Sequence, residues 1–501
     1  MKQFRTLAVA LTAAVATTLG GGALVLAGPG TAGAVAVGDE TALLAAFADA
    51  AETEIVLTAD VDLTCGGGAA VRASAVPVVV DGQGSFTITQ TCAETVLFGA
   101  SGGGGVSVRD VTLVGGIAAI EADGPIAVTG SRITGQTSAT GPVAGVAQDN
   151  SSMPVTITDS VIDTIATTAA DESAYGVAGG LQTVTRSAIS GITSPGLSAG
   201  INGSGSAVVA STIRDLSGGA AAGIYTLGPS ASVTGSTIAH LTASVESAIG
   251  VLSSGDTVVD GSRITDLVGP LAAGLLGGGD VTLSASTVAG VHGSVYSFGV
   301  IAENDGSRLT VRNATVTDVD GPGIIGTDVT VVYSTVRGNG GLNGSVGDLS
   351  VLMDAVVEPL ARPAALEALP QILTEGSLTL FGSAVVDPEP GMANCLAPSV
   401  AAIVSAGYNF ADDTSCALTG PGDRQGAGLD PLLGGLDENG GLAPTFLPQS
   451  GSPLLDAIPL DACQSGPAAG ITTDERGEPR PSFLGCDIGA VEVQVVLRFT
   501  G

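Results

Sequence analysis

A short phrase that recurs about every 25 residues is the feature that most restricts how this chain can fold. Clear copies occupy residues 210–216 (ASTIRDL), 235–241 (GSTIAHL), 261–267 (GSRITDL), 285–291 (ASTVAGV) and 313–319 (NATVTDV). Looser copies begin at residues 110, 130, 159, 186 and 333. Repeats of this length are typical of solenoids, in which each repeat forms one coil and packs on its neighbours.

A run of alternating apolar and polar residues precedes most copies, as in 106–108 (VSV), 155–157 (VTI) and 309–311 (LTV). Alternation together with β-branched residues predicts strands. Strands this short are buried when equivalent strands of successive coils stack in parallel, about 4.8 Å apart. The sequence therefore predicts an all-β fold, a right-handed parallel β-helix with about 25 residues per three-sided coil.

Stacking turns equivalent sequence positions into columns. A small hydroxyl ladder is expected at one corner, formed by Ser131, Ser160, Ser187, Ser211, Ser236, Ser262, Ser286 and Ser334, with Val111 and Ala314 as exceptions. Four positions further on, a turn column holds Gly115, Gly135, Thr164, Gly191, Asp215, His240, Asp266, Gly290, Asp318 and Gly338. Gly and Asp tolerate positive φ, which is why we predict turns there.

The turn column contains a weak candidate for a catalytic site. Asp215, His240 and Asp266 occupy it in successive coils, so His240 would lie about 5 Å from each acid. An imidazole between two carboxylates could bind a metal weakly or act as an acid or base. The simpler interpretation is a solvated turn, and the pattern around His292 indicates no role.

Six cysteines fall into three pairs, Cys65/Cys92, Cys395/Cys416 and Cys463/Cys486. The separation within each pair is close to one coil, which would bring the two Cα atoms into disulfide range. We therefore predict three disulfides between neighbouring coils, and unpaired buried thiols are the alternative. Disulfides also fit export from the cell.

Residues 1–36 have the pattern of a secretory signal peptide. Lys2 and Arg5 precede an apolar run at 7–26 and then small residues, with cleavage expected after Ala34 or Ala36. An N-terminal membrane anchor is the alternative, although three glycines at 20–22 interrupt the run. No other segment reaches transmembrane length, so we expect a secreted or cell-surface protein with no transmembrane segment in the mature chain.

The charge restricts the partners. The formal net charge is −32, and Lys2 is the one lysine of the chain. Such a surface repels nucleic acid and anionic lipid, so we expect neither as a partner. We predict no metal site and no cofactor. A structural calcium ion is left open by the acidity, but no calcium-binding loop motif is present.

The order along the chain predicts four parts. After the signal, residues 37–350 are expected to form the parallel β-helix, with a capping helix at about 39–51 over its open end. Residues 139–152, 167–175 and 268–279 are predicted to be projecting loops. Residues 351–492 are expected to hold the last coils and a Gly/Pro-rich C-terminal cap, and residues 493–501 a tail.

The C-terminal part carries six ordered motifs, at 407–409 (GYN), 428–433 (GLDPLL), 437–441 (DENGG), 451–456 (GSPLLD), 474–481 (DERGEPRP) and 486–492 (CDIGAVE). This set resembles the choice-of-anchor Q domain of bacterial exported β-helix proteins. The resemblance implies an extracellular or surface protein with a parallel β-helix, and it supplies no catalytic residue. Family members often carry an anchor after the last motif, and residues 493–501 show neither a sorting signal nor a transmembrane tail.

Charged residues of these motifs could form a buried ion-pair network in the cap, because an arginine fork matches carboxylates. The candidates are Asp474, Arg476, Arg480, Asp487 and Glu492. We therefore expect a monomeric, non-catalytic scaffold or adhesin-like surface that binds an extracellular glycan or a cell-surface partner. The alternative is a polysaccharide lyase or glycoside hydrolase on the same fold, since the fold alone does not decide function.

Overall fold

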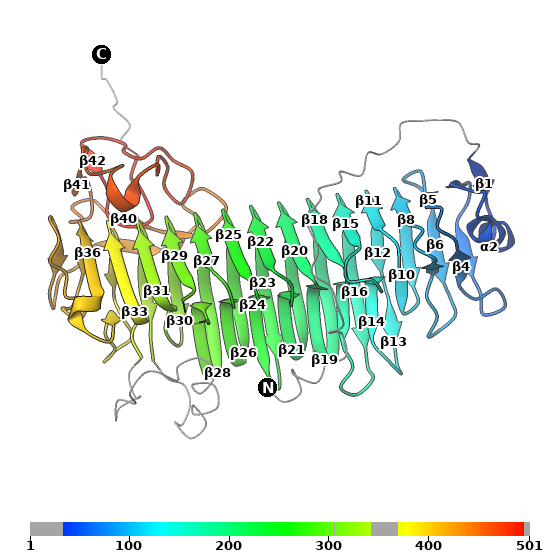
Figure 1. Cartoon of the computed structure of the whole chain (residues 1–501), viewed down its shortest axis with the longest axis horizontal. Coiled ribbons are helices and arrows are strands. Elements are labelled where there is room, and N and C mark those ends of the chain that lie inside the picture. Colours follow the sequence, from blue (N-terminus) through cyan, green and yellow to red (C-terminus); the bar gives the residue numbers. More distant parts are fainter. Residues whose placement is uncertain (1–33, 305, 342–368, 495–501) are drawn as a thin grey trace, which may run out of the picture.

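The computed structural model describes residues 34–304, 306–341 and 369–494, and these residues form an elongated solenoid (Figure 1). One sheet of 38 strands winds along its length, and the register pairs each strand with the equivalent strands of the coils before and after it, in parallel. The predicted fold class, a parallel β-helix with a short helix near its N-terminus, is confirmed.

Each coil has three sides. First-side strands include β5 (Val78–Asp81), β8 (Val106–Arg109), β11 (Ile126–Thr129), β15 (Pro154–Thr158), β18 (Leu181–Thr185), β20 (Gly205–Val209), β22 (Ser230–Thr234), β25 (Asp256–Asp260), β27 (Val281–Ser284) and β29 (Arg308–Arg312). Second-side strands include β6 (Thr87–Gln90), β9 (Thr112–Gly115), β12 (Arg132–Thr134), β16 (Val161–Thr167), β23 (Thr237–Ala243), β30 (Thr315–Val319), β32 (Thr335–Asn339) and β34 (Ala384–Val386). Third-side strands include β4 (Ala70–Ala73), β7 (Phe98–Ser101), β10 (Ala118–Ala122), β14 (Val143–Gln148), β17 (Ala174–Ala178) and β24 (Ser247–Ser253). Four long strands run continuously from the second side to the third, β19 (Ala188–Gly203), β21 (Thr212–Thr226), β26 (Arg263–Gly277) and β28 (Thr287–Ala302).

The core contains inward columns of apolar residues from all three sides. In three central coils these columns include Val208–Val233–Val259, Ile213–Ile238–Ile264 and Ile224–Val251–Leu275, all buried and in register. The second of them is the apolar fourth position of the recurring phrase. Because the same position of every coil points inward, the repeat alone specifies a continuous core.

Three-sided coils were predicted but the strands of the third side were not, and the three predicted loops are wrong in part. Residues 268–277 lie in β26, β14 occupies much of 139–152, and β17 begins at Ala174. A column of glycines interrupts apolar alternation on this side, and this is why the strands resemble loops in sequence. A Cβ added to Gly250 would lie 2.5 Å from the Gly274 carbonyl oxygen and 2.6 Å from Ile264 Cγ2. The neighbouring coil and the core leave no room there for a side chain.

The predicted serine ladder is present at the corner between the first and second sides. The Ser187 amide donates to Ser211 Oγ at 3.1 Å, and the Ser211 amide donates to Ser236 Oγ at 3.1 Å. Each hydroxyl in turn donates to a carbonyl of its own coil, as Ser211 Oγ does to Val209 O at 2.8 Å. The ladder therefore satisfies buried amides that the turn removes from the sheet.

All ten residues of the predicted turn column have positive φ, between 55° at Asp318 and 78° at Gly115. His240 has φ 56°, a backbone conformation that non-glycine residues seldom adopt. The prediction of turns at this column is confirmed.

The N-terminal end is covered by β1 (Val35–Val37) and α2 (Glu40–Ala48). The Asp39 carboxylate caps the helix by accepting from the Ala42 amide at 2.9 Å. The helix ends three residues before the predicted Ala51. Arg72 on β4 is 3% exposed, and it donates to the Phe47, Asp49, Ala50 and Glu52 carbonyl oxygens. This arginine satisfies the carbonyls at the C-terminal end of the helix, a role that the sequence did not indicate.

The coils continue through β31 (Ile324–Val332) and β33 (Ile372–Phe381) to β36 (Ile403–Gly407), β37 (Phe410–Ala411) and β38 (Arg424–Gln425). The chain then forms a cap with two short antiparallel strand pairs, β39 (Leu433–Asp437) with β40 (Thr445–Pro448), and β41 (Ile458–Pro459) with β42 (Gly485–Cys486). The cap lies back along the side of the later coils, next to β27 and β29 (Figure 1). The C-terminal motifs predict a cap that closes the last coil, and the position along the side corrects that prediction. The boundary predicted at 350/351 and most of the predicted tail lie outside the described residues.

Candidate functional site

The structure brings Asp215, His240 and Asp266 together on the turn column. His240 Nδ1 lies 3.2 Å from Asp215 Oδ1, and His240 Nε2 lies 3.4 Å from Asp266 Oδ2. Arg214 also contacts Asp215, at 3.1 Å. The side chains of the three column residues are 45–57% exposed. Attraction between charges in so much water is weak, so the geometry fits a solvated turn.

Across the described part of the chain, no group of three or more His, Cys, Asp and Glu side chains has the arrangement of metal ligands. A catalytic role for Asp215, His240 and Asp266 stays a prediction.

A second contact between a histidine and two aspartates, at His292, was not predicted from the sequence. His292 Nδ1 lies 3.2 Å from Asp320 Oδ1, and His292 Nε2 lies 3.6 Å from Asp318 Oδ2. Val291 pairs with Val319 in the register, so the next residues, His292 and Asp320, are neighbours too. Applying the coil spacing to His292 itself would have found this contact from the sequence.

A depression of about 270 Å³ lies on the third side, at β10, β14 and β17. Small residues such as Ala118, Ala144 and Ala178 line it together with Glu121, Asp149 and Tyr175. Burial raises the pKa of Glu121, and the charge of Asp149 raises it further. Burial likewise raises the pKa of Asp149, with Asp123 adding to the effect. Two carboxyl groups with raised pKa values in a partly apolar hollow are a recognised mark of a binding or catalytic site.

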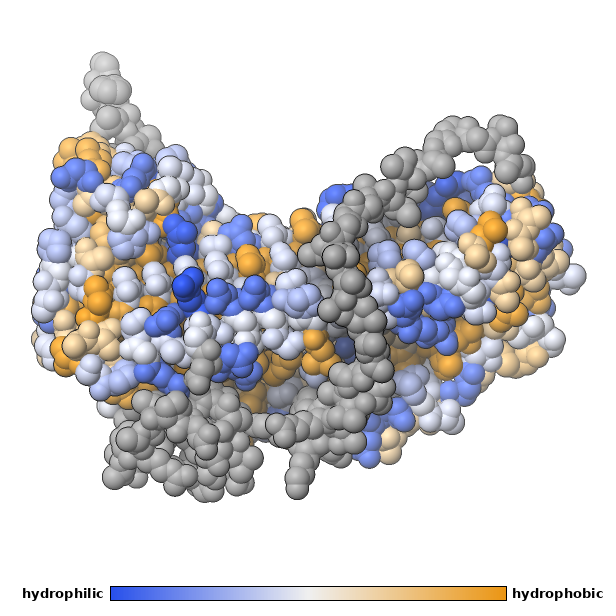
Figure 2. Space-filling model, viewed as in Figure 1, coloured by the Kyte–Doolittle hydropathy of each residue, from blue (hydrophilic) through white to orange (hydrophobic). Residues whose placement is uncertain are grey.

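Two rows of register neighbours extend from this depression along the third side. The first row is Glu121, Ala147, Ala178, Asn202, Tyr225, Leu252, Leu276 and Ile301. The second row is Ala118, Ala144, Tyr175, Ala199, Ala222, Ile249, Ala273 and Phe298. The first row is partly exposed apart from Ile301, and the second row is buried apart from Tyr175 and Phe298. Tyr296, two residues before Phe298, stacks on its ring with centroids 6.4 Å apart. Figure 2 shows apolar residues along the lower edge of the central coils, below a row of polar ones.

In the cap, Arg476 and Asp474 form a buried ion pair at 2.8 Å. Asp474 also accepts from the amides of Arg476, Glu478 and Glu492. Arg476 donates further to the carbonyl oxygens of Asn439 and Glu492. This half of the predicted network is therefore formed, and it ties three of the C-terminal motifs together.

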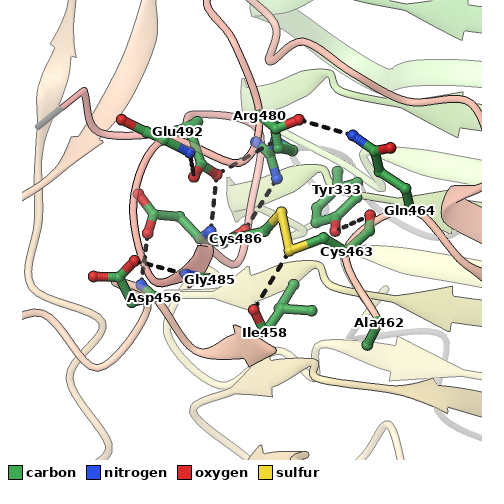
Figure 3. Close-up of a disulfide and its surroundings, with 12 residues drawn as sticks. Tyr333, Asp456, Ile458, Ala462, Cys463, Gln464, Arg480, Gly485, Cys486 and Glu492 are labelled. Atoms are coloured by element: carbon green, nitrogen blue, oxygen red, sulfur yellow. Dashed lines mark hydrogen bonds and ion pairs between the residues drawn. A yellow bond between two sulfur atoms is a disulfide. The ribbon is translucent and has the colours of Figure 1, made fainter. Parts of the chain in front are cut away.

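Arg480 occupies the centre of the other half (Figure 3). It is 1% exposed, donates to the carbonyl oxygens of Asp487 and Gly489, and lies over the Tyr333 ring at 4.1 Å. Its Nε lies 3.6 Å from Glu492 Oε2, too long for a hydrogen bond. The Glu492 oxygens accept from the Ser482 and Asp487 amides, both at 2.9 Å.

Burial shifts the pKa values of these cap carboxyls upward. It raises the pKa of Glu492 to about 7, although Arg480 opposes the shift. It also raises the pKa of Asp487, whose oxygens accept from the Asp456 and Val493 amides. The polar atoms of this network are directed at one another and at the backbone, so the arrangement serves to hold the cap together.

The sequence interpretation missed Glu475, which lies between Asp474 and Arg476. The Glu475 carboxyl group projects from the cap and contacts Thr287 and Thr315 of the solenoid. Both threonines are the third residue of a repeat phrase, a position where most copies have Thr or Arg. No feature of the sequence indicates that these two copies lie beneath the cap.

The three predicted disulfides are formed, with Cα–Cα distances of 4.8 Å for Cys65–Cys92, 4.9 Å for Cys395–Cys416 and 5.7 Å for Cys463–Cys486. The first lies two residues beyond the register pair of Leu63 and Gln90, so it joins neighbouring coils. The third joins two segments of the cap (Figure 3). The prediction that all three bridges join coils is therefore wrong for Cys463–Cys486.

No described helix has the length and apolar character needed to cross a membrane. No protein-family model matches the sequence, and no curated protein matches it significantly. Among solved structures, the chain is similar to a crystal structure of the pectate lyase Pel9A, with 12% identity over 88% of each chain and a TM-score of 0.27. This similarity is too low to bear on function.

Proposed function

We propose that this protein is an exported, non-catalytic β-helix scaffold that binds an extracellular glycan along its third side. The observation that carries the proposal is the first row, in which the partly exposed Tyr225, Leu252 and Leu276 lie in register over successive coils. Contiguous apolar surface on a soluble protein marks an interaction site. On a chain with net charge −32, a neutral polymer is accepted more readily than an anionic one.

The chemistry of the rows favours a saccharide. Tyrosine rings present an apolar face and a polar hydroxyl, which suits the mixed faces of a sugar ring. Burial raises the pKa of Tyr225, and neighbouring Tyr175 adds to the shift, so the Tyr225 phenol stays protonated and can donate. Glu121 and Asp149 could accept from sugar hydroxyls at the depression.

Glycan arrays and retention on insoluble polysaccharides test this proposal. The double variant Tyr175→Ala/Tyr225→Ala is expected to lose binding by about tenfold or more, which corresponds to about 1.4 kcal/mol. Val258→Ala is the matched control, since Val258 is an exposed apolar residue on β25, on the first side. Binding that survives the tyrosine substitutions would contradict the proposal.

Export is supported by the disulfides and by the pattern of residues 1–36. Cleavage after Ala34 would leave β1 complete, whereas cleavage after Ala36 would remove two of its three residues. Since β1 pairs with β2 (Glu54–Leu57), we propose Val35 as the mature N-terminus. The C-terminal motifs, whose charged residues build the cap, support membership of the choice-of-anchor Q proteins. N-terminal sequencing of the exported protein tests the cleavage site.

The second candidate is a glycoside hydrolase, favoured by the raised pKa values of Glu121 and Asp149. Such enzymes use two carboxyl groups on either side of the bond that is cleaved. Glu121 is in register with Ala147, two residues before Asp149, so Asp149, which directly follows β14, lies on the coil next to that of Glu121. Release of reducing sugar that is abolished by Glu121→Gln and by Asp149→Asn would establish this alternative.

A further inference from the structure

The Glu475 carboxyl group joins the cap to two coils at once. Glu475 Oε1 lies 2.7 Å from Thr287 Oγ1 on β28, and Glu475 Oε2 lies 2.6 Å from Thr315 Oγ1 on β30. The two threonines are register neighbours, one above the other in adjacent coils. Glu475 is 6% exposed, so water contributes little to solvating its charge.

Counting protons at Thr287 indicates the protonation state of this carboxyl. Thr287 Oγ1 lies 2.7 Å from the Pro444 carbonyl oxygen, which can only accept. A hydroxyl has one proton, so Thr287 donates it to Pro444 and has none for Glu475. The 2.7 Å contact with Glu475 is then a hydrogen bond only if Glu475 Oε1 carries a proton and donates it. Thr315 donates to the other oxygen, Glu475 Oε2.

The charged groups nearby do not offset ionisation. On its own loop, Asp474 is negative and Arg476 is paired with it at 2.8 Å. On the solenoid, Arg263 of β26 is the register neighbour of Thr287, and its Nη1 lies 2.7 Å from Glu438 of the cap. Burial raises the pKa of Glu475 well above its ordinary value, and Asp474 raises it further, against the hydrogen bond from Thr315.

We infer that Glu475 is a neutral carboxylic acid that fastens the C-terminal cap to the side of the solenoid, and that the cap loosens as Glu475 ionises at higher pH. Because the pKa is higher in the folded state than in the unfolded chain, the stabilisation is complete below about pH 4. It is lost as pH rises through the folded-state pKa. This inference does not depend on the proposed glycan binding.

Glu475→Gln separates the alternatives, because a carboxamide reproduces the neutral acid. Its NH₂ group can donate to Thr287 and its oxygen can accept from Thr315. The readout is hydrogen exchange at the amides of Asp474, Glu475 and Arg480, corrected for the pH dependence of intrinsic exchange. In the wild-type chain the opening constant of these amides should rise about tenfold per pH unit from about pH 4, where Glu475 ionises in the open state, and should level off above the folded-state pKa of Glu475.

The Gln variant should match the wild-type protein at about pH 4 and lose this one-proton rise at higher pH. Glu492 and Asp487 are present in both proteins, so the difference between them isolates Glu475. Thr315→Val should loosen the cap at low pH, and an infrared band of a protonated carboxyl should disappear in Glu475→Gln. An identical pH slope in Glu475→Gln, or a cap that is loose or unfolded in this variant at about pH 4, would overturn the inference.

Discussion

The solenoid and the cap bury polar groups in opposite ways. In the solenoid many buried polar groups are small and neutral, and the serine ladder uses the same two hydrogen bonds in coil after coil. In the cap several are ionisable and each occurs once, as with Asp474, Arg480 and Glu492. Repetition spreads stability over many equal interfaces, whereas the cap concentrates it in a few side chains.

This difference has an energetic consequence. A buried charge costs several kcal/mol of solvation, and its partners offset the cost only while all of them are present. A missing hydroxyl in the ladder leaves one amide to find another partner. The natural chain already tolerates such gaps, because Val111 and Ala314 occupy ladder positions. We therefore expect single substitutions to do the most damage in the cap.

Removing the central arginine of the cap tests the comparison most severely. Arg480→Ala should destabilise the cap by about 3–5 kcal/mol, because it leaves Glu492 and two carbonyls without their partner. Denaturant unfolding followed by hydrogen exchange of cap amides measures the loss. Arg186→Ala is the control, since Arg186 forms an exposed pair with Asp159 and should leave the unfolding midpoint unchanged. Equal effects of the two substitutions would remove the distinction between the regions.

The glycine column is the point where the solenoid itself should be intolerant. Gly250→Ala should cost about 1–3 kcal/mol, because its Cβ would collide with the Gly274 carbonyl and with Ile264. Gly141→Ala is the matched control, because a Cβ at Gly141 meets no atom within 4 Å. Thermal unfolding of both variants gives the comparison. An unchanged midpoint for Gly250→Ala would mean that the coils can separate locally at little cost.

One rung of the serine ladder should matter less. Ser211→Ala removes the hydroxyl that accepts from the Ser187 amide and donates to Val209 O, and we expect a loss of about 1 kcal/mol. Chemical denaturation of Ser211→Ala and of Arg480→Ala measures the loss in the free energy of unfolding for each variant, so the two regions can be compared directly. A loss as large as that of Arg480→Ala would show that the ladder is cooperative, and the contrast with the cap would fail.

The smallest effect is expected at the exposed turn. His240→Ala should change stability by less than about 1 kcal/mol, since its two carboxylate contacts are exposed. Glycan binding should be unchanged in this variant and in Asp215→Ala. Loss of binding or of any hydrolytic activity in either variant would restore the Asp–His–Asp turn as the functional site and displace the third side.

The solenoid and the cap also differ in how much of their structure could be predicted from the sequence. The serine column, the positive-φ turns and the inward Ile/Val column follow from the repeat, because stacking places equivalent residues one above another. The same rule would have found His292 beside Asp320. This rule did not reveal the strands of the third side. Close packing there requires Gly250 and the equivalent glycines, and glycine does not contribute to the pattern of apolar residues from which strands are predicted.

In the cap, the motifs indicated which residues are charged partners, and Arg476 with Asp474 bears this out. They did not indicate where the cap docks. Glu475 contacts Thr287 and Thr315, which are about 160 to 190 residues away in sequence. No local pattern encodes a contact over such a distance, and so the role of Glu475 was not predicted.

The amino-acid sequence by itself determined the parallel β-helix, its coil length, its ladders and the pairing of its cysteines, because a repeat specifies contacts between neighbours one coil apart. The tertiary structure alone decided that the cap lies along the side of the solenoid and that Cys463–Cys486 joins cap segments. It also decided which faces remain open to a ligand. These features depend on contacts between dissimilar segments far apart in the chain. The energies of these contacts depend on burial, which arises only when the distant segments pack together.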